Sequence, residues 1–165
     1  MKKFRIEIKW AFIFWIMAIF WMLLERLAGL HSVHIDKHPI FTNLFAIPAI
    51  TVYVLAMYNK RKRHYSGRMT YLQGLATGMV ITLVFTILNP LSQYLISTVI
   101  TPDFFGNAIE YAVSSGRMTK DEALGYFNLH NYIKQGYIGA PVMGAITSAI
   151  VAFFFKQGKS ETTGN

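Results

Sequence analysis

Four long apolar blocks alternate with polar connections along the chain, at residues 10–29, 40–58, 72–100 and 137–155. The third block, LQGLATGMVITLVFTILNPLSQYLISTVI, has no charged residue. At ~1.5 Å per helical residue it is long enough to cross a ~30 Å hydrocarbon layer. Such continuous runs predict helices, because a membrane β-barrel would show alternating segments of ~10 residues. We therefore expect an all-α, polytopic membrane protein, with residues 1–165 forming one domain around a bundle of four transmembrane helices.

The first block follows a basic start, MKKFRIEIK, as the apolar region of a signal peptide would. It is long, contains three tryptophans, and is followed by Glu25 and Arg26 without a small-residue cleavage site. We expect the block to be retained as the first transmembrane helix, with Glu25 and Arg26 at the level of the lipid headgroups.

The connection 101–136 is too long for a bare loop. A helix start is predicted at 101–103, where Thr, Pro and Asp follow one another, and a helix end at Gly116. Thr119 and Glu122 form a capping box for a second helix. The apolar residues of the first helix fall on one stripe, namely Phe104, Phe105, Ala108, Ile109, Ala112 and Val113. We expect an extracytoplasmic helical hairpin between the third and fourth transmembrane helices, lying on the bundle or on the outer membrane face.

The charge of the chain is distributed unevenly. Its net charge is +8, and the two termini with the connection around residues 59–70 hold eleven basic residues against two acidic ones. The other two connections hold four basic residues against five acidic ones. Because positive residues remain in the cytoplasm, both termini are predicted to be cytoplasmic in a bacterial inner membrane. This topology explains the basic character, so we expect no nucleic-acid partner.

The densest basic run is Lys60, Arg61, Lys62 and Arg63. It serves either for orientation alone or also for binding anionic lipid headgroups, at ~1 kcal/mol per basic residue.

Motifs for catalysis are missing from the sequence. There is no cysteine, which excludes disulfides, thiolate metal sites and a cysteine nucleophile. There is also no G-x-S-x-G, no paired His-Glu zinc motif and no P-loop. The sequence thus gives no positive evidence for an enzyme, and we expect no cofactor.

Small residues recur every four positions in the third and fourth blocks. Helices in lipid approach each other closely through such residues, so these stripes are expected to face protein, either within the chain or in a second copy. The stripe residues predicted to pack helices are Gly74, Gly78, Gly136, Ala140, Gly144 and Ser148.

A candidate ligand site lies in the third block at Asn89, Pro90 and Gln93. The proline removes a backbone hydrogen bond, and polar side chains beside such a break form binding sites in transporters. The same residues also occur where a helix simply bends.

The connection after the first block contains the one metal-like cluster of the sequence, His31, His34 and His38, with Asp36 between them. Imidazoles and a carboxylate bind zinc or copper, but the spacing matches no standard site. The alternative is a set of solvated histidines.

Several stretches resemble the bacterial membrane proteins grouped as domain of unknown function 4199. They are YSGRMTYLQGLATGMVITLVF, ITPDFF and GAPVMGAITSAIVAFFFKQ. The most telling residues are Gly74, Gly78, Pro102, Asp103, Phe104, Gly139 and Gly144. The resemblance implies four helices in an inner membrane, and the family supplies no activity, cofactor or catalytic residue to transfer.

Together these patterns favour a non-enzymatic structural, assembly or accessory component of the membrane, whose partners are the lipid bilayer and a second copy or another membrane protein. The alternative is a small transporter or channel subunit with a polar site at the kinked third helix.

Overall fold

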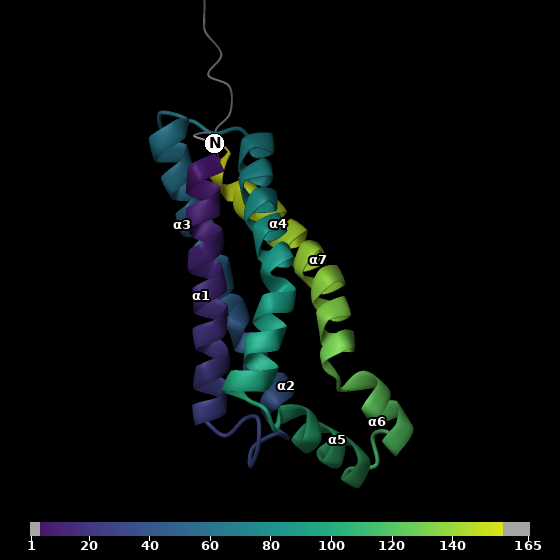
Figure 1. Cartoon of the computed structure of the whole chain (residues 1–165). Coiled ribbons are helices and arrows are strands. Elements are labelled where there is room, and N and C mark those ends of the chain that lie inside the picture. The colour runs from purple at the N-terminus through teal and green to yellow at the C-terminus, as the bar shows by residue number, and fades with distance from the viewer. Residues whose placement is uncertain (1–3, 157–165) are drawn as a thin grey trace, which may run out of the picture.

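The computed structural model describes residues 4–156, and every regular element in that range is helical. Four long segments run along the molecule (Figure 1). They are α1 (Arg5–Leu27), α3 (Ala46–His64), α4 (Tyr71–Leu95) and α7 (Leu129–Phe155). A short α2 (His38–Phe41) and a 3₁₀ turn, η2 (Thr42–Phe45), extend α3, and a π-helical turn, η3 (Ile96–Ile100), extends α4. All four segments are long and apolar enough to cross a membrane, which confirms the all-α, four-span prediction.

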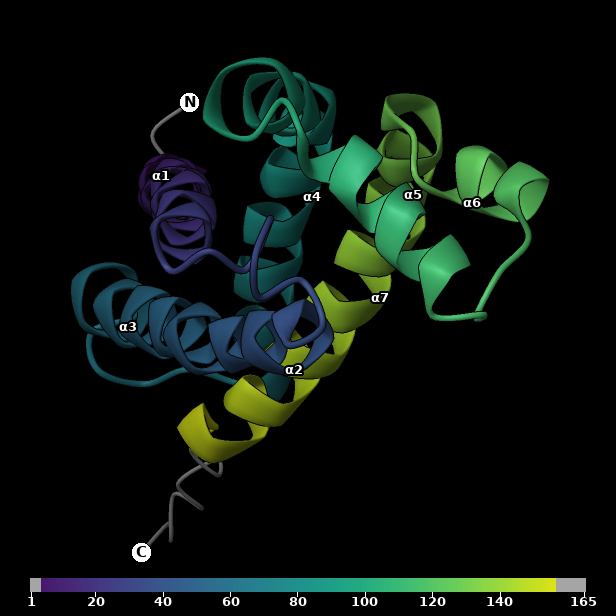
Figure 2. The same cartoon turned by 90° about the horizontal axis from the view of Figure 1, so that it is seen from below.

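The two ends of the bundle differ. At one end, α1 and α4 begin while α3 and α7 finish (Figure 1). We call it the basic end because it carries the basic run at residues 60–63. The opposite end carries α5 (Phe104–Ser114), and α6 (Lys120–Tyr126) lies beyond α5 at the side of the molecule (Figure 2); we call this the covered end. The position of α5 and α6 outside the membrane stays a prediction.

The helix boundaries near the covered end differ from those predicted. Helix α7 begins at Leu129, not at residue 137, because the Asn128 side chain accepts a hydrogen bond from the N–H of Asn131 and caps the helix. Helix α5 begins after Asp103, with Thr101 outside it. The predicted capping box of Thr119 and Glu122 is present at the start of α6.

Helix α7 packs most extensively on α4, and the two run antiparallel. Small or polar residues of the two helices meet in four pairs, three of them spaced four residues apart, so closely that a Cβ added to any of the glycines would overlap its neighbour. The pairs are Gly74 with Ala152, Gly78 with Ser148, Thr82 with Gly144, and Asn89 with Gly136. Ala140, the remaining residue of the predicted stripe, lines a groove between α3 and α7.

An aromatic core joins the other helices. Phe14 on α1 is buried, and its ring packs against Phe45, Tyr53 and Phe85 at centroid distances of 5.9, 5.7 and 4.4 Å. These contacts connect α1 to the α2–α3 segment and to α4.

Several polar side chains inside the bundle are hydrogen-bonded, although Glu7 Oε2 and Trp10 Nε1 are buried without a hydrogen-bond partner among the described residues. Threonine and serine hydroxyls donate to carbonyls one turn earlier in their own helices, as Thr86 does to Thr82. Trp15 Nε1 donates to Ser92 Oγ at 2.6 Å, which connects α1 to α4. The Tyr53 and Thr82 hydroxyls share a hydrogen bond of 2.7 Å between α3 and α4. Such pairing lowers the cost of polar atoms in an apolar environment.

Candidate functional site

Three ligand-type side chains meet at the covered end of the bundle. Glu25 comes from the last turn of α1, His31 from the following connection and His38 from the start of α2. Both His31 Nε2 and His38 Nε2 face Glu25 Oε2, at 3.2 and 3.4 Å. Glu25 and His31 are each 3% exposed and His38 is 20% exposed. We call Glu25, His31 and His38 the Glu–His cluster.

The backbone after α1 brings His31 back beside Glu25. The helix ends at Leu27, and Gly29 adopts a φ of +73°, in the left-handed region that favours glycine. The N–H of Leu30 then donates to the carbonyl of Glu25 at 3.0 Å. This reversal places the next side chain, His31, against the carboxylate one turn before the helix end.

Neighbouring residues fix and cover the Glu–His cluster. Trp21, one turn before Glu25 on α1, donates from Nε1 to Glu25 Oε1 at 2.6 Å. Asn107 on α5 donates to the backbone carbonyl of His31 at 2.8 Å. The ring of Phe104 packs against both imidazoles, at centroid distances of 5.1 and 5.2 Å. Helix α5 thereby covers the cluster and limits the access of water.

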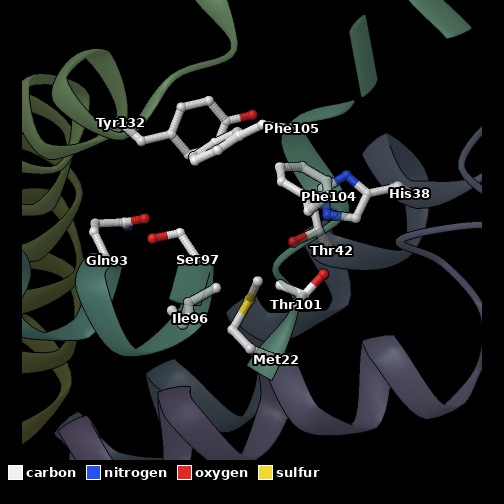
Figure 3. A pocket seen from close by; sticks show the side chains of 10 residues that line it. All are labelled: Met22, His38, Thr42, Gln93, Ile96, Ser97, Thr101, Phe104, Phe105 and Tyr132. Carbon is white, nitrogen blue, oxygen red and sulfur yellow. The ribbon is translucent and has the colours of Figure 1, made fainter. Parts of the chain in front are cut away.

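His38 also lines a cavity of about 200 Å³ (Figure 3). Its wall combines apolar and aromatic side chains with an imidazole and hydroxyl and amide groups, and α1, α2, η2, α4, η3, α5 and α7 all contribute to it. The lining residues are Met22, His38, Thr42, Gln93, Ile96, Ser97, Thr101, Phe104, Phe105 and Tyr132. The Glu–His cluster therefore adjoins a space large enough for a few water molecules or a small ligand.

The residues predicted for a polar site on α4 do not share one site, because Asn89 contacts α7 and Gln93 lines the cavity. Asn89 is buried, lies against Gly136 and donates from Nδ2 to the Ile133 carbonyl on α7 at 2.9 Å. Pro90 follows it inside α4, and Gln93 lines the cavity. Asn89 thus joins two helices, whereas Gln93 faces the space beside His38.

The predicted histidine cluster is brought together only in part. His31 and His38 converge, while His34 is exposed and lies outside the cluster. Sequence reasoning missed Glu25 as their partner because it placed this residue among lipid headgroups. The available signal was an acidic residue at the end of an apolar helix, six residues before His31.

The basic run is also divided. Lys60 is only 2% exposed, and its Nζ pairs with Glu7 Oε1 at 2.7 Å, so this ammonium faces a carboxylate rather than lipid headgroups. The guanidinium of Arg61 lies over the Phe155 ring, 5.1 Å from its centroid. Lys62 and Arg63 are exposed. Tyr65 lies near the ion pair of Glu7 and Lys60. Burial and the negative charge of Glu7 raise the pKa of the Tyr65 hydroxyl above its ordinary value.

A protein-family model described as "Protein of unknown function (DUF4199)" matches residues 9–157. No curated protein and no solved structure matches the chain. The match covers most of the chain, including all of the residues that form the Glu–His cluster and the α4–α7 contact.

Proposed function

We infer that the chain, which belongs to the DUF4199 family of proteins of unknown function, is a multi-pass membrane protein with a non-enzymatic assembly or accessory role. We propose that it resides in a bacterial cytoplasmic membrane with the basic end and both termini in the cytoplasm. The excess of basic residues at that end supports this orientation.

One observation carries the assembly role: an apolar groove of about 360 Å³ between α3 and α7. On the α7 side it is lined by Gly139, Ala140, Met143 and Gly144. Nothing lies within 4 Å of the position of a Cβ on Gly139. Small residues with open space above them allow another membrane helix to approach closely.

The opposite wall of the groove is formed by α3, where Ala46, Ala49 and Ile50 take part. The rings of Phe14, Tyr53 and Phe85 also line it. Because this surface is mostly apolar, with Thr42, Asn43 and Thr147 as polar members, it suits a transmembrane helix of a second copy or of a partner protein better than an aqueous solute.

The hydrogen bonding of Asn89 favours the assembly role over the transporter alternative. Its amide is used to hold α7 on α4, and its partner is a backbone carbonyl of the same chain. The transporter or channel alternative would require this amide to exchange its partner for a ligand.

Cysteine cross-linking tests the assembly role cleanly, because the chain has no cysteine of its own. Met143→Cys places a thiol in the groove at a position that is 61% exposed. Leu83→Cys, at a position 60% exposed on α4 and outside the groove, is the matched control. In native membranes treated with a short bismaleimide or an oxidant, Met143→Cys is expected to give a dimer or a defined adduct and Leu83→Cys a monomer.

Adding Gly139→Leu to the Met143→Cys chain is expected to abolish this adduct, because the leucine fills the groove. Monomers from both cysteine variants, or equal products from both, would contradict the proposed assembly surface.

A further inference from the structure

We propose that Glu25, His31 and His38 form a binding site for a divalent transition-metal ion of the Zn²⁺ class. The inference is independent of the assembly role, since the Glu–His cluster lies at the covered end and the groove lies between α3 and α7.

Two of the three distances between the ligand atoms match those in a metal coordination shell. The two imidazole nitrogens lie 3.2 and 3.4 Å from the same carboxylate oxygen, and all three atoms lie within 4.8 Å of one another. Zinc–ligand bonds of ~2.0–2.2 Å at tetrahedral angles hold neighbouring ligand atoms ~3.3–3.6 Å apart. An ion can therefore enter with small shifts of the side chains.

The same distances are long for a histidine–carboxylate hydrogen bond. Charge-assisted N–H···O bonds are usually ~2.7–2.9 Å long. Both histidines direct Nε2 at Oε2, while the other oxygen, Oε1, is already bonded to Trp21. Both imidazoles thus converge on a single carboxylate oxygen that accepts no shorter hydrogen bond from them.

The set of ligand types selects the class of ion. Two imidazoles and one carboxylate suit Zn²⁺ and neighbouring first-row metals, whereas Ca²⁺ and Mg²⁺ prefer oxygen ligands throughout. Three protein ligands leave a fourth tetrahedral position for water or a small ligand. The cavity beside His38 provides space for that fourth ligand.

The surroundings hold the ligands in place. The Trp21 N–H fixes the carboxylate, and Asn107 fixes the backbone of His31. Phe104 covers both imidazoles. Partners of this kind orient metal ligands, and losing one typically lowers metal affinity by ~10–100-fold.

The test uses the full chain purified in a mild detergent or nanodisc, stripped with a chelator and then titrated with Zn²⁺ by calorimetry. We expect one Zn²⁺ per chain. Glu25→Gln and His38→Gln are each expected to weaken binding by more than the ~10–100-fold typical of losing a supporting residue, and Trp21→Phe by about that amount. His34→Gln is the matched control, since His34 lies in the same connection but is exposed, and it is expected to bind as the unmodified chain does.

A second measurement keeps the proposal falsifiable if the variants fail to fold. The unmodified chain titrated with Co²⁺ is expected to show the intense visible absorption of a tetrahedral site, which Zn²⁺ abolishes. Absence of stoichiometric Zn²⁺ binding, a weak spectrum like that of aqueous Co²⁺, or binding retained in both Glu25→Gln and His38→Gln would overturn the proposal. A loss in His34→Gln as large as that in His38→Gln would do the same.

Discussion

At the scale of single residues, the absence of a side chain has different consequences at two glycines of α7. A Cβ on Gly144 would overlap the side chain of Thr82, while a Cβ on Gly139 would meet nothing within 4 Å. Both residues are small and belong to one helix, but only Gly144 is required for the contact with α4.

Gly144→Leu is therefore expected to destabilise the fold by roughly 1–3 kcal/mol or more, the usual cost of overpacking. Gly139→Leu is the control and is expected to leave the stability of the isolated chain nearly unchanged. Unfolding in detergent with increasing SDS measures both, and equal destabilisation by the two variants would contradict the packing described for α7.

The buried pair of Glu7 and Lys60 gives a second prediction at this scale. Removing one partner leaves the other charge buried without its counter-ion, which typically costs roughly 3–5 kcal/mol. Lys60→Met is thus expected to lower stability strongly in the same SDS assay. Combining it with Glu7→Leu is expected to recover most of the loss, because no unpaired charge is then buried. A double variant as unstable as Lys60→Met alone would argue against the pair.

Asn89→Leu separates the two roles considered for Asn89. Loss of its hydrogen bond to the Ile133 carbonyl is expected to cost roughly 0.5–2 kcal/mol, the range measured for polar contacts between membrane helices. A variant as stable as the unmodified chain would show that the amide does not join α4 to α7.

At the scale of elements, α6 depends on its first turn. The backbone N–H of Thr119 donates to Glu122 Oε2 at 2.8 Å, as does the Thr119 hydroxyl. These hydrogen bonds hold the pKa of Glu122 below its ordinary value. The Glu122 carboxylate therefore stabilises α6 fully above the ordinary pKa of a glutamate, and this contribution is lost as the pH falls through the lowered pKa.

Thr119→Ala removes the cap and is expected to destabilise α6 locally by about 1 kcal/mol. Hydrogen exchange of the α6 amides measures this loss, which should be smaller at a pH below the lowered pKa of Glu122. Exchange in α5 serves as the internal control. Unchanged exchange in α6 at neutral pH would contradict the role of the capping box.

The four membrane helices could be predicted from the sequence because hydropathy sums over a whole block. Each apolar block is so long that no single residue changes the prediction. The start of α7 could not, since residues 130–135 fall in the connection that the sequence pattern assigns to the hairpin, and the helix starts at Leu129 because Asn128 supplies a cap. The repeated spacing of Gly74, Gly78 and Gly144 predicts that these helix faces contact protein, but leaves open whether that protein is the same chain or a second copy.

The Glu–His cluster was only partly predictable. His31 and His38 stood out as residue types, but their partner Glu25 lies in α1, where its carboxylate contacts Trp21, His31 and His38 only in the folded chain. The backbone reversal at Gly29 is what brings the carboxylate and His31 together. Lys60 was hidden in the same way, because its pairing with Glu7 requires the packing of α1 against α3.

At the scale of the whole molecule, the packed core and the open regions occupy different places. The buried cluster around Phe14, Met57 and Ile81 connects α1, α3 and α4, while the groove between α3 and α7 leaves Gly139 without a neighbour among the described residues. A bundle that is closed on one side and open on another supports a role in assembly with a further membrane helix.

Native mass spectrometry of the full chain released from nanodiscs tests this central claim most directly. The account predicts an assembly of two or more copies, or a defined complex with a second membrane protein, that Gly139→Leu converts to a monomer without loss of folding. A folded, unmodified chain that is monomeric and free of any protein partner, indistinguishable from Gly139→Leu, would contradict it.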